Sequence, residues 1–256
     1  MADDDEIGPE PYEPDFGPPP KRSTFAFIVC SPIGRVGKTL TARLVVDYFL
    51  SDDRRPLAFD TNHFDPGLMA AFPKLTRVVD LTSTRGQMAL FDALVQPDHV
   101  PKVVDLWHNS YDLFFRQAHD LGFFTEAWGR GIEPVLLLMT DEKERFSREI
   151  RDLAADFRGV KVVVVHDQGT TTLPETAINP RPASLAHHVL VVPEIDLVVR
   201  RFIDEEKVLL DRLIRDPSSE ISFVIQSRIR ALLGPFFDQV ESLERKLLFE
   251  NTSFLG

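Results

Sequence analysis

Short apolar runs alternate along this chain with stretches in which apolar residues recur every three or four positions. The runs have strand length and predict buried strands at residues 25–29, 57–60, 77–81, 102–106, 134–139, 161–165 and 189–192. The stretches between them predict helices with inward faces of Leu40, Leu44, Val45 and Tyr48; Met88, Phe91, Leu94 and Val95; Tyr111, Phe114, Phe115 and Ala118; and Phe146, Ile150, Leu153, Ala154 and Phe157, with Asp141 as an N-cap of the last. This alternation predicts a three-layer, Rossmann-like α/β fold, a mostly parallel sheet with helices on both faces.

The two ends of the chain differ from this middle part. Residues 1–22 contain seven acidic residues and six prolines, so we expect a disordered tail, with a partner-docking segment around Tyr12 and Phe16 as the alternative. Residues 23–196 hold all the predicted strands and form the predicted α/β domain. Residues 197–256 are helical in pattern and are expected to pack on the same domain as an extension of three helices, with faces of Phe202, Leu209, Leu210 and Leu213; Val224, Ile225, Ile229 and Leu232, after a turn at Asp216-Pro217; and Phe236, Phe237, Val240, Leu243 and Leu247, from Pro235 onward.

The first strand and the first helix are joined by a glycine-bearing turn that has the chemistry of a phosphate site. A polyphosphate needs inward-pointing backbone N–H groups and a helix N-terminus, and glycine permits the tight turn that supplies them. Lys38 is placed to reach the β- and γ-phosphates, and the Thr39 hydroxyl to hold Mg²⁺. We therefore expect the nucleotide to be held by Gly34, Arg35, Val36, Gly37, Lys38, Thr39 and Leu40. The standard pattern has glycine where this chain has Pro32, and the alternative is an ordinary strand-to-helix turn with an exposed lysine.

Acidic residues close two of the predicted strands on the same edge of the sheet. Asp60 ends the second strand and Asp105 ends the strand at 102–106. Because ligands of such sheets sit beyond the carboxyl ends of parallel strands, both acids are expected near Lys38, where they would order the water ligands of Mg²⁺. Asp80 closes a similar run and is the competitor of Asp105.

Composition limits the classes of partner. Lys and Arg number 29 against 40 Asp and Glu, a net charge of -11 that does not support broad attachment to DNA or an anionic membrane, although a local DNA contact stays open. The single cysteine, Cys30, rules out a disulfide framework, and neither a signal-peptide pattern nor a membrane-length apolar run occurs, so a cytoplasmic protein is expected. The histidines show no metal-ligand spacing; His63 and His108 fall near the expected crevice.

Residues 24–195 resemble the ParA/MinD family of P-loop ATPases, which has a deviant Walker A loop. Gly34, Val36, Gly37, Lys38 and Thr39 match the loop, Asp60 matches the first acid of the strand-ending Asp-x-Asp, and Asp105 resembles the Walker B acid. The resemblance implies binding of ATP and Mg²⁺, and a nucleotide-dependent homodimer that acts as a switch for a protein partner in positioning or segregation. Asp167 falls where the family often has an asparagine that reads adenine, which leaves the choice between ATP and GTP open.

Two departures from the family pattern concern hydrolysis. Ile33 stands where the family has its signature lysine, and Asn62 where it has the second acid, which is associated with positioning the attacking water and is therefore a catalytic candidate here. Arg35 and Asp65 are candidate substitutes. Slow or partner-stimulated hydrolysis is expected. The alternatives are a nucleotide-binding adaptor that does not hydrolyse, and a kinase or ligase similar to dethiobiotin synthetase, for which Arg85 and the loop after Asp60 are the available substrate contacts.

Overall fold

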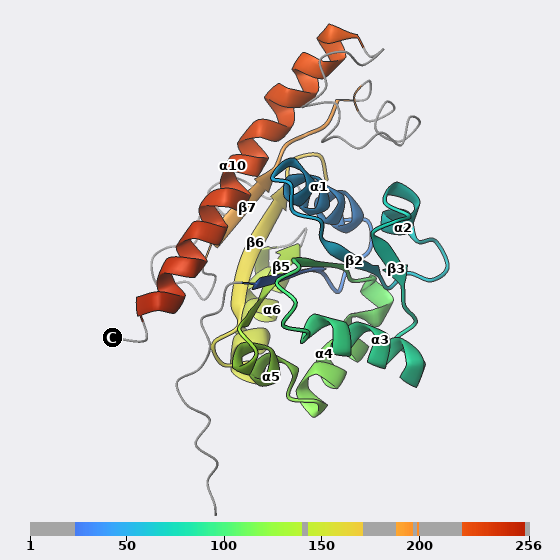
Figure 1. Cartoon of the computed structure of the whole chain (residues 1–256), viewed down its shortest axis with the longest axis vertical. Helices are drawn as coiled ribbons and strands as arrows, with labels where there is room; N and C mark the ends of the chain where they lie inside the picture. The colour runs from blue at the N-terminus through green and yellow to red at the C-terminus, as the bar shows by residue number, and fades with distance from the viewer. Residues whose placement is uncertain (1–23, 140–142, 171–187, 197–198, 200–221, 254–256) are drawn as a thin grey trace, which may run out of the picture.

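The protein contains one seven-stranded, entirely parallel sheet (Figure 1), described here from a computed structural model that covers residues 24–139, 143–170, 188–196, 199 and 222–253. The strands are β1 (Thr24–Cys30), β2 (Leu57–Asp60), β3 (Thr76–Val78), β4 (Lys102–Asp105), β5 (Ile132–Met139), β6 (Lys161–Asp167) and β7 (His188–Val192). Their order across the sheet is β3-β2-β4-β1-β5-β6-β7. This confirms the predicted α/β class, and each predicted strand lies within two or three residues of an observed one.

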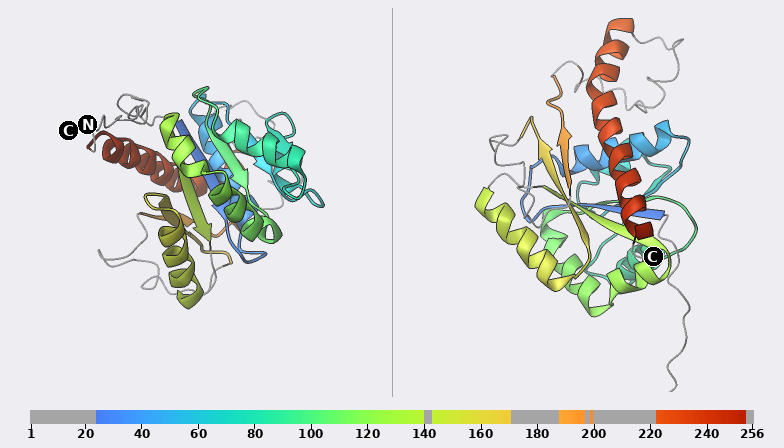
Figure 2. Two further views of the ribbon diagram at one scale, coloured as in Figure 1. Left: turned by 90° about the horizontal axis from the view of Figure 1, so that it is seen from below. Right: turned by 90° about the vertical axis from the view of Figure 1, so that its left-hand side faces the viewer.

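Two apolar cores sandwich the sheet, because successive residues of a strand point to opposite faces. Phe25, Phe27 and Val29 of β1 point into one core, and Ala26, Ile28 and Cys30 into the other. The first core is closed by α1 (Lys38–Ser51), the short α2 (Gly67–Ala71) and α10 (Phe223–Ser253), and the second by α3 (Thr84–Leu94), α4 (Tyr111–Asp120), α5 (Phe123–Gly129) and α6 (Lys143–Asp156). A 3₁₀ turn, η1 (His108–Ser110), precedes α4. Figure 2 shows the helices on the two faces.

Some sequence predictions were wrong in detail. Met88, predicted on the inward face of α3, is 57% exposed, and the buried positions are Gly86, Leu90, Phe91 and Leu94. No predicted helix corresponds to α5, and Val224, predicted on an inward face, is 58% exposed. The predicted tail at residues 1–22, the cap Asp141, the side chain of Phe146, the turn at 216–217 and the helix with Phe202 lie outside the described residues.

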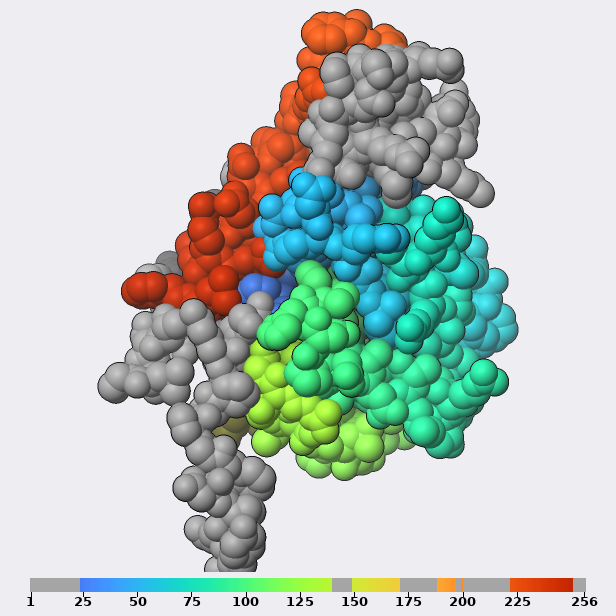
Figure 3. Space-filling model, in the orientation of Figure 1, coloured from blue at the N-terminus to red at the C-terminus, as the bar shows by residue number. Residues whose placement is uncertain are grey.

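The last two predicted helices are one continuous helix, α10, which contains Pro235. An internal proline costs about 3 kcal/mol, which is why a break was expected there. The buried residues run without interruption across it, at the helical spacing Ile229, Leu233, Phe236, Val240, Leu243 and Leu247. Burial of this stripe against α1 and β7 outweighs the cost of the proline. The space-filling view shows α10 lying along the domain beside α1 (Figure 3).

Polar contacts fix the position of α10. Glu244, 6% exposed, accepts a hydrogen bond from the Tyr48 hydroxyl at 2.6 Å and two from the Arg54 guanidinium at 3.0 and 2.7 Å. The amide of Gln239 accepts from the Val191 N–H at 2.8 Å and donates to its carbonyl at 3.3 Å, so it occupies backbone groups of the edge strand β7. These two groups of Val191 are therefore not free to pair with another strand. In the described part of the chain, no helix is both long and apolar enough to cross a membrane.

We expect Glu244→Gln to destabilise the protein by about 2 kcal/mol, because it removes a bidentate partner from Arg54 and leaves the Tyr48 hydroxyl with a weaker acceptor. Equilibrium unfolding in urea measures the change. Glu241→Gln makes the same chemical change one turn away, at an exposed pair with Arg245, and is expected to cost less than about 0.5 kcal/mol. Equal losses for the two variants would show that the buried contact does not hold α10 in place.

Candidate functional site

The loop from Ser31 to Gly37 folds into a tight cradle between β1 and α1. Its Ile33 N–H donates to the Ser31 hydroxyl at 3.1 Å, and the Lys38 ammonium folds back to donate to the Ile33 carbonyl at 2.6 Å. Gly37 is the N-cap of α1 and has φ +88°, while Arg35, which is not a glycine, has φ +63°. The backbone therefore has two residues in the left-handed region directly before the helix, a conformation that also occurs in anion-binding turns.

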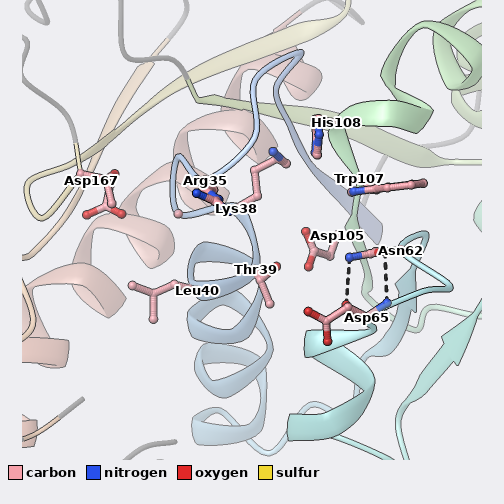
Figure 4. A pocket seen from close by; sticks show the side chains of 12 residues that line it. Arg35, Lys38, Thr39, Leu40, Asn62, Asp65, Asp105, Trp107, His108 and Asp167 are labelled. Atoms are coloured by element: carbon pink, nitrogen blue, oxygen red, sulfur yellow. Dashed lines mark hydrogen bonds between the residues drawn. The ribbon is translucent and has the colours of Figure 1, made fainter. Parts of the chain in front are cut away.

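A pocket of about 500 Å³ lies in front of this loop (Figure 4). Its lining comes from the loop, the N-terminus of α1, and the segments that follow β2, β4 and β6: Arg35, Gly37, Lys38, Thr39, Leu40, Asn62, Asp65, Asp105, Trp107, His108, Asp167 and Thr170. Of the residues predicted from the sequence, Gly34, Val36 and Asp60 are not in the lining. Val36 is buried in the core, and Gly34 lies beneath the His108 ring.

Lys38 and Asp105 form the charged centre of the pocket. Lys38 is 8% exposed, and burial lowers the pKa of its ammonium, an effect that Asp105 opposes. Asp105 is 5% exposed, and burial raises the pKa of its carboxyl to about 7, with Asp60 adding to the rise while a hydrogen bond from Thr39 and the charge of Lys38 oppose it. The Thr39 hydroxyl and the Asp105 carboxyl thus lie within hydrogen-bond distance of each other, and these are oxygen groups that could hold Mg²⁺ or its water ligands.

Asp60 lies next to Asp105 but is turned toward the backbone of its own loop. The strand register pairs the two acids, and Asp60 is fully buried. Its carboxylate accepts from the N–H groups of Asn62 at 3.0 Å, Leu68 at 2.9 Å and Met69 at 3.4 Å, so it joins the loop to the start of α2. Burial raises its pKa, and these three bonds oppose the rise. The predicted role in ordering the waters of a metal therefore depends on the remaining lone pairs of this carboxylate.

The structure separates the two competing strand-end acids. Asp105 lines the pocket, whereas Asp80, at the far edge of the sheet, accepts from the N–H and hydroxyl of Thr82 and faces His63 at 3.9 Å. Arg85, on α3, is likewise outside the lining. Among the described residues there is no group of three or more His, Cys, Asp or Glu side chains arranged to hold a metal. A divalent cation here would thus take ligands from a phosphate chain and water as well as from the protein.

Asp167 closes the other end of the pocket and packs against the loop. It is 2% exposed, and its Oδ1 accepts from the Gly169 N–H at 2.9 Å. Its Oδ2 lies so near Gly37 that a Cβ added there would be 2.1 Å from it. Glycine is required at 37 both for this close approach and for the positive φ.

Trp107 and Thr170 are pocket residues that the sequence reading did not propose as contacts. Trp107 follows Asp105 by two residues, and its backbone N–H donates to the Thr61 hydroxyl at 2.7 Å. The backbone N–H of Thr61 donates in turn to the Asp105 carbonyl at 3.2 Å. The signal for both was positional, since each comes within three residues of the carboxyl end of a parallel strand. His108, noted only as near the crevice, also lines the pocket, and burial lowers its pKa, as does the charge of Lys38.

No model of a known protein family matches the chain, and no curated protein matches it. The resemblance to the ParA/MinD family therefore stays a prediction from the motifs.

We expect Gly37→Ala to disrupt the loop, because the new Cβ would meet the Asp167 carboxylate in addition to the strain of a positive φ. The loss of stability should be at least about 3 kcal/mol, measured by urea unfolding without nucleotide. Gly122→Ala is the matched control: it too has a positive φ, +61°, but nothing lies within 4 Å of the added atom, so about 1 kcal/mol is expected. Similar losses would indicate that strain alone, without the Asp167 contact, sets the cost.

The pKa of Asp105 predicts a pH-dependent stability. A carboxyl whose pKa is about 7 in the folded chain and near its ordinary 3.8 when unfolded binds more protons in the folded state between those values. Stability is therefore lost as the pH rises from about 4 to about 7, by about 3 kcal/mol from this group. Asp105→Asn removes that contribution, so its free energy of unfolding should exceed that of the parent at pH 8 and approach it at pH 4. A constant difference across the range would contradict the assignment.

Proposed function

We propose that this protein binds a nucleoside triphosphate together with Mg²⁺, with ATP as the first candidate. The observation that carries the proposal is the meeting of Lys38, Thr39 and Asp105 in one pocket at the N-terminus of α1. The cradle of the loop, the helix end and the buried lysine suit the phosphate chain. The pocket volume of about 500 Å³ lies in the range of small-molecule and cofactor sites.

Mg²⁺ is proposed as part of the ligand because the pocket is acidic without it. Asp65, Asp105 and Asp167 line the pocket, against the cations Lys38 and Arg35. Bound to the phosphates, the ion would neutralise charge and hold the terminal phosphate in position. The Thr39 hydroxyl would bind the ion directly. Asp105, with Asp60 behind it, would bind the water ligands of the ion. The same ion would favour the ionised form of Asp105, whose pKa burial has raised.

The biological role that fits best is a cytoplasmic, ParA/MinD-like switch that forms a homodimer when nucleotide is bound and acts on a protein partner in positioning or segregation. This rests on the loop and strand-end motifs. Hydrolysis is proposed to be slow or partner-stimulated, because Ile33 cannot supply a charge to the transition state. Arg35, which is exposed, is the one other cation that lines the pocket among the described residues, if His108 is left aside.

A nucleotide-binding adaptor that does not hydrolyse is the second candidate, and the position of Asn62 favours it. The Asn62 amide donates to the Asp65 carbonyl at 2.9 Å, and its oxygen accepts from the Asp65 N–H at 3.3 Å. Both ends of the amide thus brace the loop, which leaves the amide N–H₂ and oxygen poorly placed to orient an attacking water. Such an adaptor would hold nucleotide without turning it over.

We expect Lys38→Ala to abolish binding of ATP and Mg²⁺, because it removes the buried cation proposed to bind the phosphates and leaves only the exposed Arg35 against three carboxylates. Isothermal titration calorimetry measures the affinity. Lys74→Ala, which changes an exposed lysine outside the pocket, should leave it unchanged. If Lys38→Ala binds as tightly as the parent, the loop is a structural turn and the proposed function is wrong.

A further inference from the structure

Three aromatic rings form an exposed cluster beside the pocket. Phe64 lies on the loop after β2, and its ring centroid is 4.1 Å from that of His63 and 5.6 Å from that of Trp107. The ring centroids of His63 and Trp107 are 6.1 Å apart. Phe64 is 75% exposed, so it contributes little to the core. We call His63, Phe64 and Trp107 the ring cluster. It belongs to the same site as the phosphate loop, because Trp107 lines the pocket.

Hydrogen bonds hold the backbone of the ring cluster in place. The backbone N–H of Trp107 donates to the Thr61 hydroxyl, and this bond joins the segment after β4 to the segment after β2. The two bonds between Asn62 and Asp65 close the turn that carries His63 and Phe64. A ligand that stacks on these rings would therefore meet surfaces that are largely pre-organised, which lowers the entropic cost of binding.

The ring cluster lies on the side of the terminal phosphate, if the nucleotide binds as proposed above. Thr39 and Asp105 mark the position of Mg²⁺ and with it the end of the phosphate chain. Asp167 lies on the opposite side of the loop from Trp107 and Asn62 (Figure 4). The base would then extend toward Asp167 and leave the part of the pocket between Trp107, His108 and Asp65 for another molecule.

We propose that this part of the pocket binds a second small molecule, which has a flat ring and an amino or hydroxyl group, against the terminal phosphate of the nucleotide. The ring would stack on the face of Trp107, and its edge would contact Phe64, whose ring lies at 61° to that of Trp107. The amino or hydroxyl group would donate to Asp65, whose carboxylate makes no hydrogen bond or ion pair in the described part of the chain. Acidic walls select a donor or a cation over an anion. A concave pocket favours a small molecule over a flat protein surface.

Ligand-observed NMR with benzylamine, a flat ring with one amino group, tests the proposal on the full chain with ADP and Mg²⁺ present. We expect saturation transfer to benzylamine, and an affinity about tenfold lower in Trp107→Ala and in Phe64→Ala. Cyclohexylmethylamine has the same amino group without an aromatic face and should bind about tenfold more weakly than benzylamine. Phe249→Ala, which removes a phenylalanine of similar exposure (74%) on α10, is the matched control and should bind benzylamine as the parent does.

Several results would overturn the proposal. Absence of a benzylamine signal, or a signal that Trp107→Ala and Phe64→Ala leave intact, would show that the ring cluster is no binding site. Displacement of benzylamine by ADP and Mg²⁺ would place the nucleotide base on the rings instead. A dimer that dissociates on Phe64→Ala, seen by light scattering, would assign the rings to a second copy of the chain. Lys38→Ala separates this proposal from the one above, because it should remove nucleotide binding and leave binding of benzylamine alone in place.

Discussion

The candidate site depends on the parallel pairing of β4 with both β1 and β2. The register sets Val29 beside Asp105 and Asp60 beside Asp105, so the strand ends meet at the point where the chain leaves β1 for the loop and α1. A slip of one residue would turn Asp105 to the opposite face and bring an apolar neighbour to Thr39. Because β4 lies between β1 and β2, an acid from a distant part of the sequence faces the N-terminus of α1. The sheet register thus places Asp105, while the loops and the start of α1 place Arg35, Asp65 and Lys38.

Burial shifts the pKa values of the two central charged groups of the pocket toward their neutral forms. Burial removes Asp105 from water and, with the nearby carboxylate of Asp60, raises its pKa to about 7. Burial acts on Lys38 in the opposite direction and weakens its charged form, while its ammonium stays bound to the Ile33 carbonyl. A cation that enters the pocket would displace the proton of Asp105, so metal binding and proton release are linked.

The main elements of the fold and the centre of the site could be predicted from the sequence, and the parts held by long-range contacts could not. The β1–loop–α1 unit and the choice of Asp105 over Asp80 follow from local patterns, because strands, turns and strand-end acids are short-range features. The capping of α2 by Asp60 could not be predicted, since α2 has five residues and no periodicity that would mark it. The continuity of α10 through Pro235 depends on burial against α1 and β7, which no local pattern shows.

The two departures from the ParA/MinD pattern have structural counterparts in the pocket. The Ile33 side chain packs against the core beside α1, while its carbonyl holds Lys38, so a lysine at 33 would have to leave these apolar contacts to reach another molecule. Asn62 stabilises the turn that carries Phe64, because its amide oxygen accepts from the Asp65 N–H and its amide nitrogen donates to the Asp65 carbonyl. An aspartate at position 62 could still accept the first bond, but it has no donor for the second. Both residues therefore stabilise the walls of the pocket. Rigid walls of this kind lower the entropic cost of holding a ligand in the pocket.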